Sequence, residues 1–212
     1  MKITWIAHAS FLLEDSKGRK LLTDPYDNSI GHKIYKGDAD IITISHHHFD
    51  HEYTDEINKS SKILDKVGIF NLCDIPIEGL PTYHDKFKGA KRGENTIYII
   101  EMDGYKICHL GDLGHNLSND TLEKIGKIDV LLIPVGGNFT IDAKEAATIC
   151  KQIGSHIVIP MHYKTPKIDF PIDGVDKFIT EMKNGERVNS STIEINKPLT
   201  GSNMVKLLDY SN

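Results

Sequence analysis

Short apolar runs separated by polar turns dominate the first part of the chain. The first 25 residues carry such runs on either side of a polar turn at residues 15–18, which predicts a strand meander. Residues 40–45 then form a nearly continuous β-branched run, a pattern typical of a strand buried on both faces. The amino-terminal part of the chain is therefore expected to form a β-sheet.

The second part of the chain repeats these strand patterns. Residues 96–102 and 105–109 flank the pair Asp103-Gly104, which predicts a β-hairpin whose register is fixed by the turn. Further strands are expected at four places: 130–134, 156–160, 192–195 and 204–208.

Apolar residues at helical spacing predict helices between these strands. Four helices are expected: 57–67, 117–125, 142–153 and a last long helix over 175–182. A glycine follows each of the first three directly, as is typical of a helix C-terminus.

The strands and helices interleave along the chain, and no linker or low-complexity stretch divides them. This layout predicts an α+β fold in which two packed, mixed β-sheets are flanked by helices. A length of 212 residues fits a single domain over residues 1–212.

Composition narrows the class of protein. Hydrophobic residues make up 39% and charged residues 26% of the chain, which excludes a disordered chain and a membrane-spanning protein. The net charge of −5 does not favour a dedicated nucleic-acid surface, so a nucleic-acid partner is not expected. Cys73, Cys108 and Cys150 lie far apart without a CxxC motif. Together with an apolar N-terminal stretch too short for a signal peptide, they predict a cytoplasmic protein.

Histidine points to a specific chemistry. The chain has 11 histidines, more than its 8 prolines, 8 tyrosines or 7 phenylalanines. His46, His48, Asp50 and His51 come directly after the predicted strand at 40–45. In an extended segment residues i, i+2 and i+4 project to one side, so three of these side chains can converge on one metal ion. The alternative is a solvated histidine run, which is not expected directly behind a buried strand.

Other predicted strands also end in polar residues. Asp112 closely follows the strand at 105–109, and His162 closely follows the strand at 156–160. Since one six-residue loop cannot complete a metal coordination shell, distant residues must supply further ligands.

The order of these motifs resembles the metallo-β-lactamase-fold superfamily. The loop at 46–51 is similar to its HxHxDH signature, and His84, Asp112 and His162 follow in the family's order. Three further stretches are similar to small bacterial metal-dependent hydrolases related to ascorbate-6-phosphate lactonase and N-acyl-phosphatidylethanolamine phospholipase D: 5–14, 23–25 and 133–140. The resemblance covers nearly the whole chain and implies a four-layer αβ/βα sandwich built from two pseudo-related halves.

The resemblance also implies a dinuclear metal site. One ion would be held by three histidines: His46, His48 and His84. The other would be held by a carboxylate and two histidines: Asp50, His51 and His162. Asp112 would bridge the two ions, which are expected to be zinc, with manganese or iron as alternatives. A hydroxide between them would attack the substrate, and Asp50 would orient and deprotonate that water.

Several other residues are placed around this site with less support from the sequence. Three are candidates for the pocket: His8, Asp24 and Tyr163. A buried, hydrogen-bonded histidine is the alternative for His8, and a simple strand-end turn is the alternative for Asp24. We expect His84 to lie in a loop and the loops at 26–38 and 85–95 to line the pocket. Four histidines are expected to be structural or surface residues: His32, His109, His115 and His156.

The predicted reaction is hydrolysis of a small-molecule lactone, ester or phosphodiester. The chain has no G-x-S-x-G motif, so a serine nucleophile is not expected. Two alternatives share the fold: a nuclease, for which a pI of 6.1 leaves little room for a basic exosite, and a mononuclear iron oxidoreductase. A metal-binding protein without catalytic activity is the remaining alternative, and the chain could act as a monomer or as a homo-oligomer.

Overall fold

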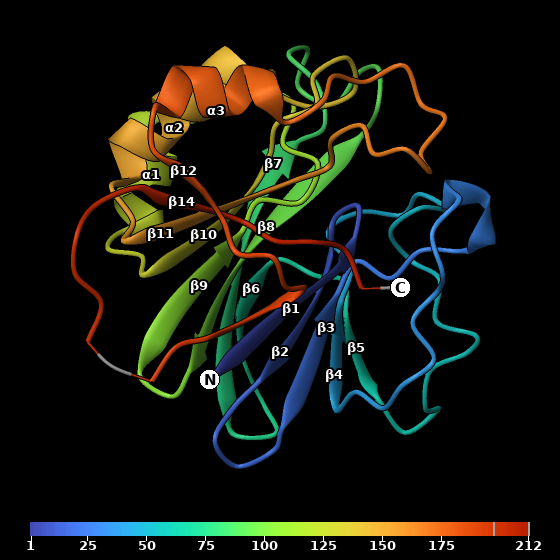
Figure 1. Ribbon diagram of the computed structural model, residues 1–212. Coiled ribbons are helices and arrows are strands. Elements are labelled where there is room, and N and C mark those ends of the chain that lie inside the picture. Colours follow the sequence, from blue (N-terminus) through green and yellow to red (C-terminus); the bar gives the residue numbers. More distant parts are fainter. Residues whose placement is uncertain (197, 212) are drawn as a thin grey trace.

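The structure is a computed structural model that describes residues 1–196 and 198–211. Two mixed β-sheets pack face to face, with helices above one of them (Figure 1). None of the described helices has the length and apolar character needed to cross a membrane.

The smaller sheet has six strands in the order β13-β1-β2-β3-β4-β5. The first three strands in sequence form the predicted antiparallel meander, and the next two add to it in parallel. Its members are β1 (Lys2–Ala7), β2 (Ser10–Glu14), β3 (Lys20–Thr23), β4 (Ile41–Thr43), β5 (Lys62–Leu64) and β13 (Thr192–Glu194).

The larger sheet has eight strands in the order β12-β14-β11-β10-β9-β8-β7-β6. It is antiparallel from β6 to β9 and parallel from β9 to β12. Its members are β6 (Gly68–Leu72), β7 (Ile75–Tyr83), β8 (Glu94–Met102), β9 (Tyr105–His109), β10 (Val130–Pro134), β11 (Ile157–Met161), β12 (Gly185–Arg187) and β14 (Met204–Leu207). The predicted hairpin is confirmed as β8 and β9.

Successive residues on the smaller sheet point into two different cores. Leu21 and Ile41 belong to the large core that also contains the strands of the other sheet. Leu22 and Ile42 belong to a second core on the opposite face. This alternation explains why these strands read as continuous apolar runs, since both of their faces are buried.

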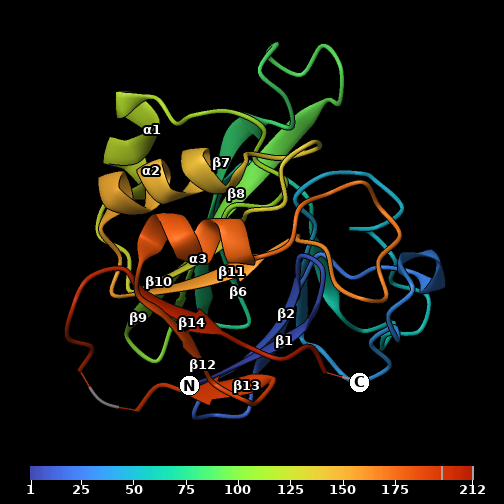
Figure 2. The same cartoon turned by 45° about the horizontal axis from the view of Figure 1, so that its top comes forward.

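The two outer faces of the sandwich are covered differently. All three α-helices in the described part of the chain lie over the larger sheet (Figures 1 and 2): α1 (Asn119–Ile125), α2 (Ala143–Ile153) and α3 (Asp176–Met182). The smaller sheet is covered by loops and by the 3-10 turn η1 (Asn28–Ile30), which contribute Ile30, Ile57 and Ile168 to the second core. The expected α+β sandwich of two mixed sheets is confirmed, with loops forming the outer layer on the smaller sheet.

The predicted helix at 142–153 is confirmed as α2, and its ends show why the sequence folds this way. Asp142 accepts hydrogen bonds from the backbone N–H groups of Lys144 and Glu145, and the Glu145 side chain bonds back to the Asp142 N–H. This capping box satisfies donors that the first helical turn leaves free. Gly154 then ends the helix in a left-handed conformation.

The helix predicted at 57–67 is wrong. Residues 62–64 form β5 at the edge of the smaller sheet, and β6 begins at residue 68. Ile57 packs in the second core whereas Leu64 packs in the large core, so their spacing never described one helix face. The turn between them is fixed by Asn58, whose side chain accepts a hydrogen bond from the Ser60 N–H. The last helix is confirmed as α3 (Asp176–Met182), within the predicted range, although it is only seven residues long.

Two glycines let loops pass very close to the strand ends that carry His84 and His162. A Cβ atom at Gly114 would overlap the backbone of His84 and Asp85, and one at Gly136 would overlap the His162 carbonyl. Only glycine allows backbones to approach this closely. These contacts tie the positions of both histidines to the surrounding fold.

Gly114→Ala is therefore expected to lower the free energy of unfolding by about 1–3 kcal/mol, because the clash is with backbone and cannot be relieved by a side-chain rotation. Urea unfolding of the purified variant measures this change. Gly174→Ala is the matched control, since a Cβ atom there meets no atom within 4 Å. Equal stability of the two variants would contradict the close packing at His84.

Candidate metal centre

The ends of six strands meet at one edge of the sandwich and deliver a cluster of polar side chains. β4 leads into the loop at 46–51, β9 leads to Asp112, and β11 is followed directly by His162. β7 is followed directly by His84, so this residue sits at a strand end and not in a separate loop as expected. His8 follows β1 and Asp24 follows β3. The cluster thus draws on both sheets.

Two groups within this cluster have the composition of metal sites. In each group, one nitrogen or oxygen atom per residue lies within 4.8 Å of those of the other members. The first group contains three histidines: His46, His48 and His84. The second contains a carboxylate and three histidines: Asp50, His51, His162 and His8. These groups match the two predicted ligand sets, with His8 added to the second.

Asp112 lies between the two groups, and with His46 and His51 it forms a third group of the same kind. Its Oδ2 atom is 3.3 Å from His84 Nε2, 3.3 Å from His51 Nε2 and 3.1 Å from His162 Nε2. Its side chain is almost fully buried. A single carboxylate oxygen therefore faces histidines of both groups, which is the arrangement that a bridging ligand requires.

Asp24 supports the cluster from beneath. Its Oδ2 atom is 2.9 Å from His51 Nδ1 and accepts a 2.6 Å hydrogen bond from the Ser45 hydroxyl. Its Oδ1 atom accepts the Ser45 N–H at 2.7 Å. A carboxylate on Nδ1 fixes the ring orientation of His51 and directs Nε2 toward Asp112. Asp24 thus contacts the metal-like cluster through His51 and does not line the pocket itself.

Three residues of the cluster hold unfavourable backbone conformations. The φ angles of His8, Asp24 and His162 are 53°, 38° and 50°, in the left-handed region that non-glycine residues seldom adopt. Each such residue costs on the order of 1 kcal/mol or more, and such strain concentrates at functional sites. Their surroundings, which include the His162 N–H bonded to the His8 carbonyl at 3.1 Å, hold these conformations in place.

Three of the histidines in the cluster, His8, His46 and His84, are held in the neutral form that binds metal. Burial, with His51 nearby, lowers the pKa of His46 to about 2, and burial together with His162 lowers the pKa of His8 to about 4. Burial also lowers the pKa of His84. His51 differs, because Asp112, Asp24 and Asp50 surround it and raise its pKa well above the usual value in spite of burial.

The carboxylates of the cluster have lowered pKa values, so they carry a negative charge. Burial alone would raise the pKa of Asp112, but His162 and His51 hold it well below its usual range. Asp50 behaves in the same way, with His51 and His8 as the opposing groups. Both groups are therefore ionised and ready to act as anionic ligands.

The hydrogen bonding of the cluster fits a metal ion better than a purely structural role. Among the described residues, nine buried side-chain nitrogen or oxygen atoms have no hydrogen-bond partner, and five of them lie in this cluster. The five are His8 Nδ1, His51 Nε2, His84 Nδ1, Asp112 Oδ1 and His162 Nδ1. Buried polar atoms without partners are costly, and bound cations are one established explanation for them. Imidazole and carboxylate are also the ligands preferred by zinc, manganese and iron.

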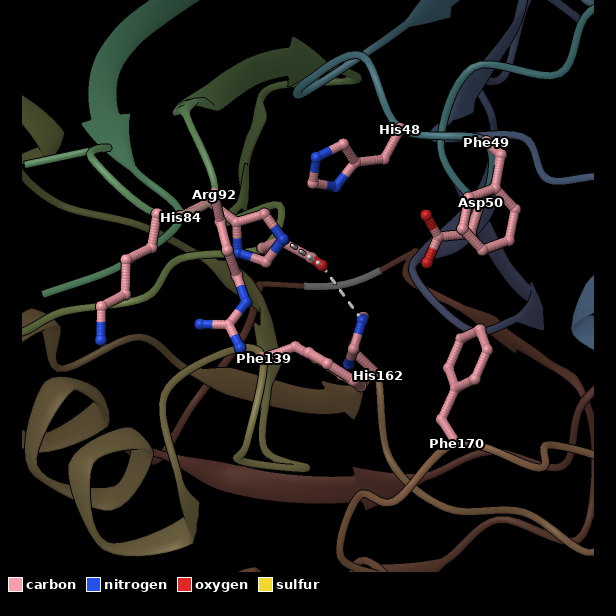
Figure 3. Close-up of a pocket in the computed structure, with 10 residues that line it drawn as sticks. His48, Phe49, Asp50, His84, Arg92, Phe139, His162 and Phe170 are labelled. Atoms are coloured by element: carbon pink, nitrogen blue, oxygen red, sulfur yellow. Dashed lines mark ion pairs between the residues drawn. The ribbon is translucent and has the colours of Figure 1, made fainter.

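A pocket of about 330 Å³ opens over the cluster (Figure 3). Five cluster residues form its floor: His48, Asp50, His84, Asp112 and His162. Its walls carry three phenylalanines and two basic residues that the sequence did not single out: Phe49, Phe139, Phe170, Lys91 and Arg92. This volume is at the lower end of the range for sites that bind small molecules.

The remaining candidates lie outside the pocket wall. Tyr163 is buried against Trp5, with ring centroids 5.2 Å apart, and does not line the pocket. His8 is fully buried behind Asp50, with its Nε2 atom 3.1 Å from Asp50 Oδ2. The loop at 85–95 contributes Lys91 and Arg92, whereas the loop at 26–38 contributes no lining residue.

The four histidines expected to be structural or surface residues stay outside the three metal-like groups. His109 is buried and lies 2.8 Å from the Ala9 carbonyl oxygen, and His32 lies 2.8 Å from the Thr165 hydroxyl. His115 accepts the Tyr83 N–H, and His156 lies beside the Gly201 carbonyl.

Sequence comparisons identify the family of the chain. Residues 2–162 match the model of the β-lactamase superfamily domain. A UPF0173 metal-dependent hydrolase of Methanosphaerula palustris is 30% identical over 226 residues, which cover 92% of this chain and 100% of that protein. Another, from Methanoculleus marisnigri, is 31% identical over 188 residues, which cover 78% of this chain and 82% of that protein.

Comparison with solved structures leads to the same family. A Thermotoga maritima crystal structure, assigned provisionally as a Zn-dependent hydrolase of the metallo-β-lactamase superfamily, is 36% identical with a TM-score of 0.84 and covers 99% of both chains. The metallo-β-lactamase-fold protein YhfI of Bacillus subtilis, at 13% identity and a TM-score of 0.65, covers 100% of this chain and 98% of its own and shares the fold. The chain therefore belongs to the metallo-β-lactamase superfamily and groups within it with the UPF0173 metal-dependent hydrolases.

Proposed function

We propose that this protein is a hydrolase with a dinuclear metal centre that cleaves a small-molecule lactone, ester or phosphodiester. The observation that carries the proposal is the position of Asp112 Oδ2, at 3.1–3.3 Å from histidines of both metal-like groups. The names of the relatives, metal-dependent hydrolase and Zn-dependent hydrolase, support the same reaction class.

The ligand sets of the proposal follow the two groups. One ion would be held by His46, His48 and His84. The other would be held by Asp50, His51 and His162, with Asp112 shared. Zinc, manganese and iron all bind imidazole and carboxylate. We favour zinc among them because the similar Thermotoga maritima structure carries the name of a Zn-dependent hydrolase. Bound divalent ions would supply Lewis acidity and make water a stronger nucleophile near neutral pH.

The protein's own groups would perform the remaining tasks. Asp50 lies at the pocket floor with one oxygen 3.1 Å from His8 Nε2, which fixes the direction of the carboxylate. From this position Asp50 would orient the attacking water and accept its proton. The phenylalanines of the wall would limit access of bulk water, which strengthens electrostatic interactions at the floor.

The size of the pocket favours a small molecule over nucleic acid. A volume of about 330 Å³ fits one compact substrate, while a nucleic-acid enzyme requires a long basic surface. The three cysteines are free thiols, which supports a location in the reducing cytoplasm.

Metal analysis tests the proposal first. The purified protein is expected to carry about two divalent transition ions per chain, as two-metal hydrolases do, and Asp112→Ala is expected to lose most of one. Inductively coupled plasma mass spectrometry after dialysis in chelator-free buffer measures both. A wild-type protein that binds no metal under metal-replete conditions would overturn the proposal.

Two adjacent histidines offer a matched pair for an activity test. His48→Ala is expected to lower metal-dependent turnover of lactone, thioester or phosphodiester substrates by roughly 100-fold or more, because it removes a proposed ligand from the pocket floor. His47→Ala is expected to keep wild-type turnover, since His47 is exposed and pairs with Glu52 away from the pocket. Equal turnover by both variants would place the reaction elsewhere.

The affinity for zinc is expected to rise with pH through the neutral range. The raised pKa of His51 means that the metal-free protein keeps a proton on this ring near pH 7, and zinc must displace it. Raising the pH toward the folded-state pKa of His51 weakens the competition between the proton and zinc. Lowering the pH strengthens this competition. Competition titrations with a chelator at pH 6, 7 and 8, corrected for the chelator's own protonation, measure the trend. A zinc affinity that is constant from pH 6 to 8 would contradict the protonated state of His51.

A further inference from the structure

Arg92 stands out among the arginines of the chain. The sequence contains three: Arg19, Arg92 and Arg187. Arg19 pairs with Asp15 at 2.6 Å, and Arg187 pairs with Asp209 at 3.5 Å. Arg92 forms no ion pair within the described residues, although it is partly buried in the wall of the pocket. A guanidinium in such a position has five N–H donors to offer a ligand.

The loop that carries Arg92 is held in a fixed shape. Asp85 is buried and accepts hydrogen bonds from four backbone N–H groups of this loop: Phe87, Gly89, Lys91 and Arg92. Their lengths of 2.7–3.0 Å lie within the normal range of N–H···O hydrogen bonds. Lys86 joins the loop to α2 through a salt bridge with Glu145. The backbone beneath Arg92 is therefore already ordered before any ligand binds.

Two carboxylates of α2 and its cap that share a hollow with Arg92 are engaged in other contacts. Asp142 and Glu145 line the adjoining hollow with Arg92, but Asp142 caps α2 and Glu145 binds Lys86. The Arg92 guanidinium lies over the Phe139 ring, 5.3 Å from its centroid. A cation–π contact of this kind does not engage the N–H donors of the guanidinium in hydrogen bonds.

The pocket wall combines basic and apolar side chains. Arg92 lies on one side against Phe139, with Lys91 also in the wall, while Phe49 and Phe170 lie on the opposite side with Asp50 (Figure 3). The rings of Phe49 and Phe170 are 6.5 Å apart. A neutral substrate would leave both basic residues without a counter-charge, whereas a substrate with an anionic end and an apolar end would match both sides.

We propose that Arg92, assisted by Lys91, is the binding site for an oxyanion of the substrate, a carboxylate or a phosphoryl group separate from the bond that is cleaved. This inference rests on the proposed function and adds the class of substrate: a small anionic ester or phosphoester whose apolar portion packs against Phe49 and Phe170. The planar fork of arginine suits the two oxygens of either oxyanion.

Binding measurements test this subsite without turnover. Isothermal titration calorimetry of the zinc-loaded protein would compare phenylphosphonate and phenylacetate with phenylacetamide, the neutral counterpart of phenylacetate. Arg92→Met is expected to raise the Kd of at least one of the two anions about tenfold or more, as expected for losing a charge-assisted bidentate contact. The Kd of phenylacetamide is expected to stay within about twofold.

Two further variants control the test. Lys88→Met removes a positive charge from the same loop but not from the pocket, and it is expected to leave all three Kd values unchanged. Arg92→Lys keeps the charge and is expected to recover part of the lost affinity, with thermal melting confirming that each variant is folded. An effect on one anion alone identifies which oxyanion the site prefers.

The proposal would be overturned if wild-type protein bound neither anion, if Arg92→Met bound both as tightly as wild type, or if Lys88→Met weakened them equally. Because no turnover is measured, a protein that binds these anions through Arg92 but hydrolyses no substrate would contradict the proposed function and leave the subsite intact.

Discussion

The structure depends on placing one ionised carboxylate, Asp112, among buried imidazoles. Burying a charge is costly unless partners compensate for it, and Asp112 Oδ2 has three histidine Nε2 atoms within 3.3 Å. The carboxylates around His51 raise its pKa, whereas burial lowers the pKa of His84. Several buried nitrogen and oxygen atoms of this cluster also have no hydrogen-bond partner, and bound divalent cations would satisfy them.

The sandwich makes this arrangement rigid. Each proposed ligand is itself buried or half-buried and lies at or beyond the end of a strand, so the side chains have little freedom to move apart. The left-handed conformations of His8, Asp24 and His162 are maintained against their intrinsic cost by the same packing. Close contacts at Gly114 and Gly136 fix two of the strand ends further. The proposed contacts to the substrate come from the pocket wall above, which carries Arg92, Phe49 and Phe170.

The parts of the site encoded by local patterns were predictable from the sequence. His46, His48 and Asp50 were predictable as a cluster because they come directly behind a buried strand. The expected convergence of all three on one ion was wrong, because the segment turns, with the His51 N–H bonded to the His48 carbonyl, and Asp50 joins the second group. Asp112 and His162 followed from the same rule that polar residues at the ends of buried strands face a common edge. The strand meander, the hairpin and α2 rested on turn and capping residues that act locally.

Other features depend on tertiary packing, which a periodic pattern does not encode. Ile57 and Leu64 have helical spacing but belong to different cores, so the predicted helix was wrong. His84 could not be placed at a strand end because β7 contains glycine and proline and does not read as a regular strand. The role proposed for Arg92 depends on its position in the pocket wall and on the absence of an ion pair among the described residues, and neither is encoded in a local pattern. Its one sequence signal is an adjacent Lys-Arg pair between two glycines.

Anomalous diffraction from crystals of the zinc-loaded protein, collected at the zinc absorption edge, tests the central claim most directly. The account predicts two peaks about 4 Å apart on either side of the Asp112 carboxylate, one beside His48 and His84 and the other beside His51 and His162. A single peak, or peaks away from Asp112, would contradict it.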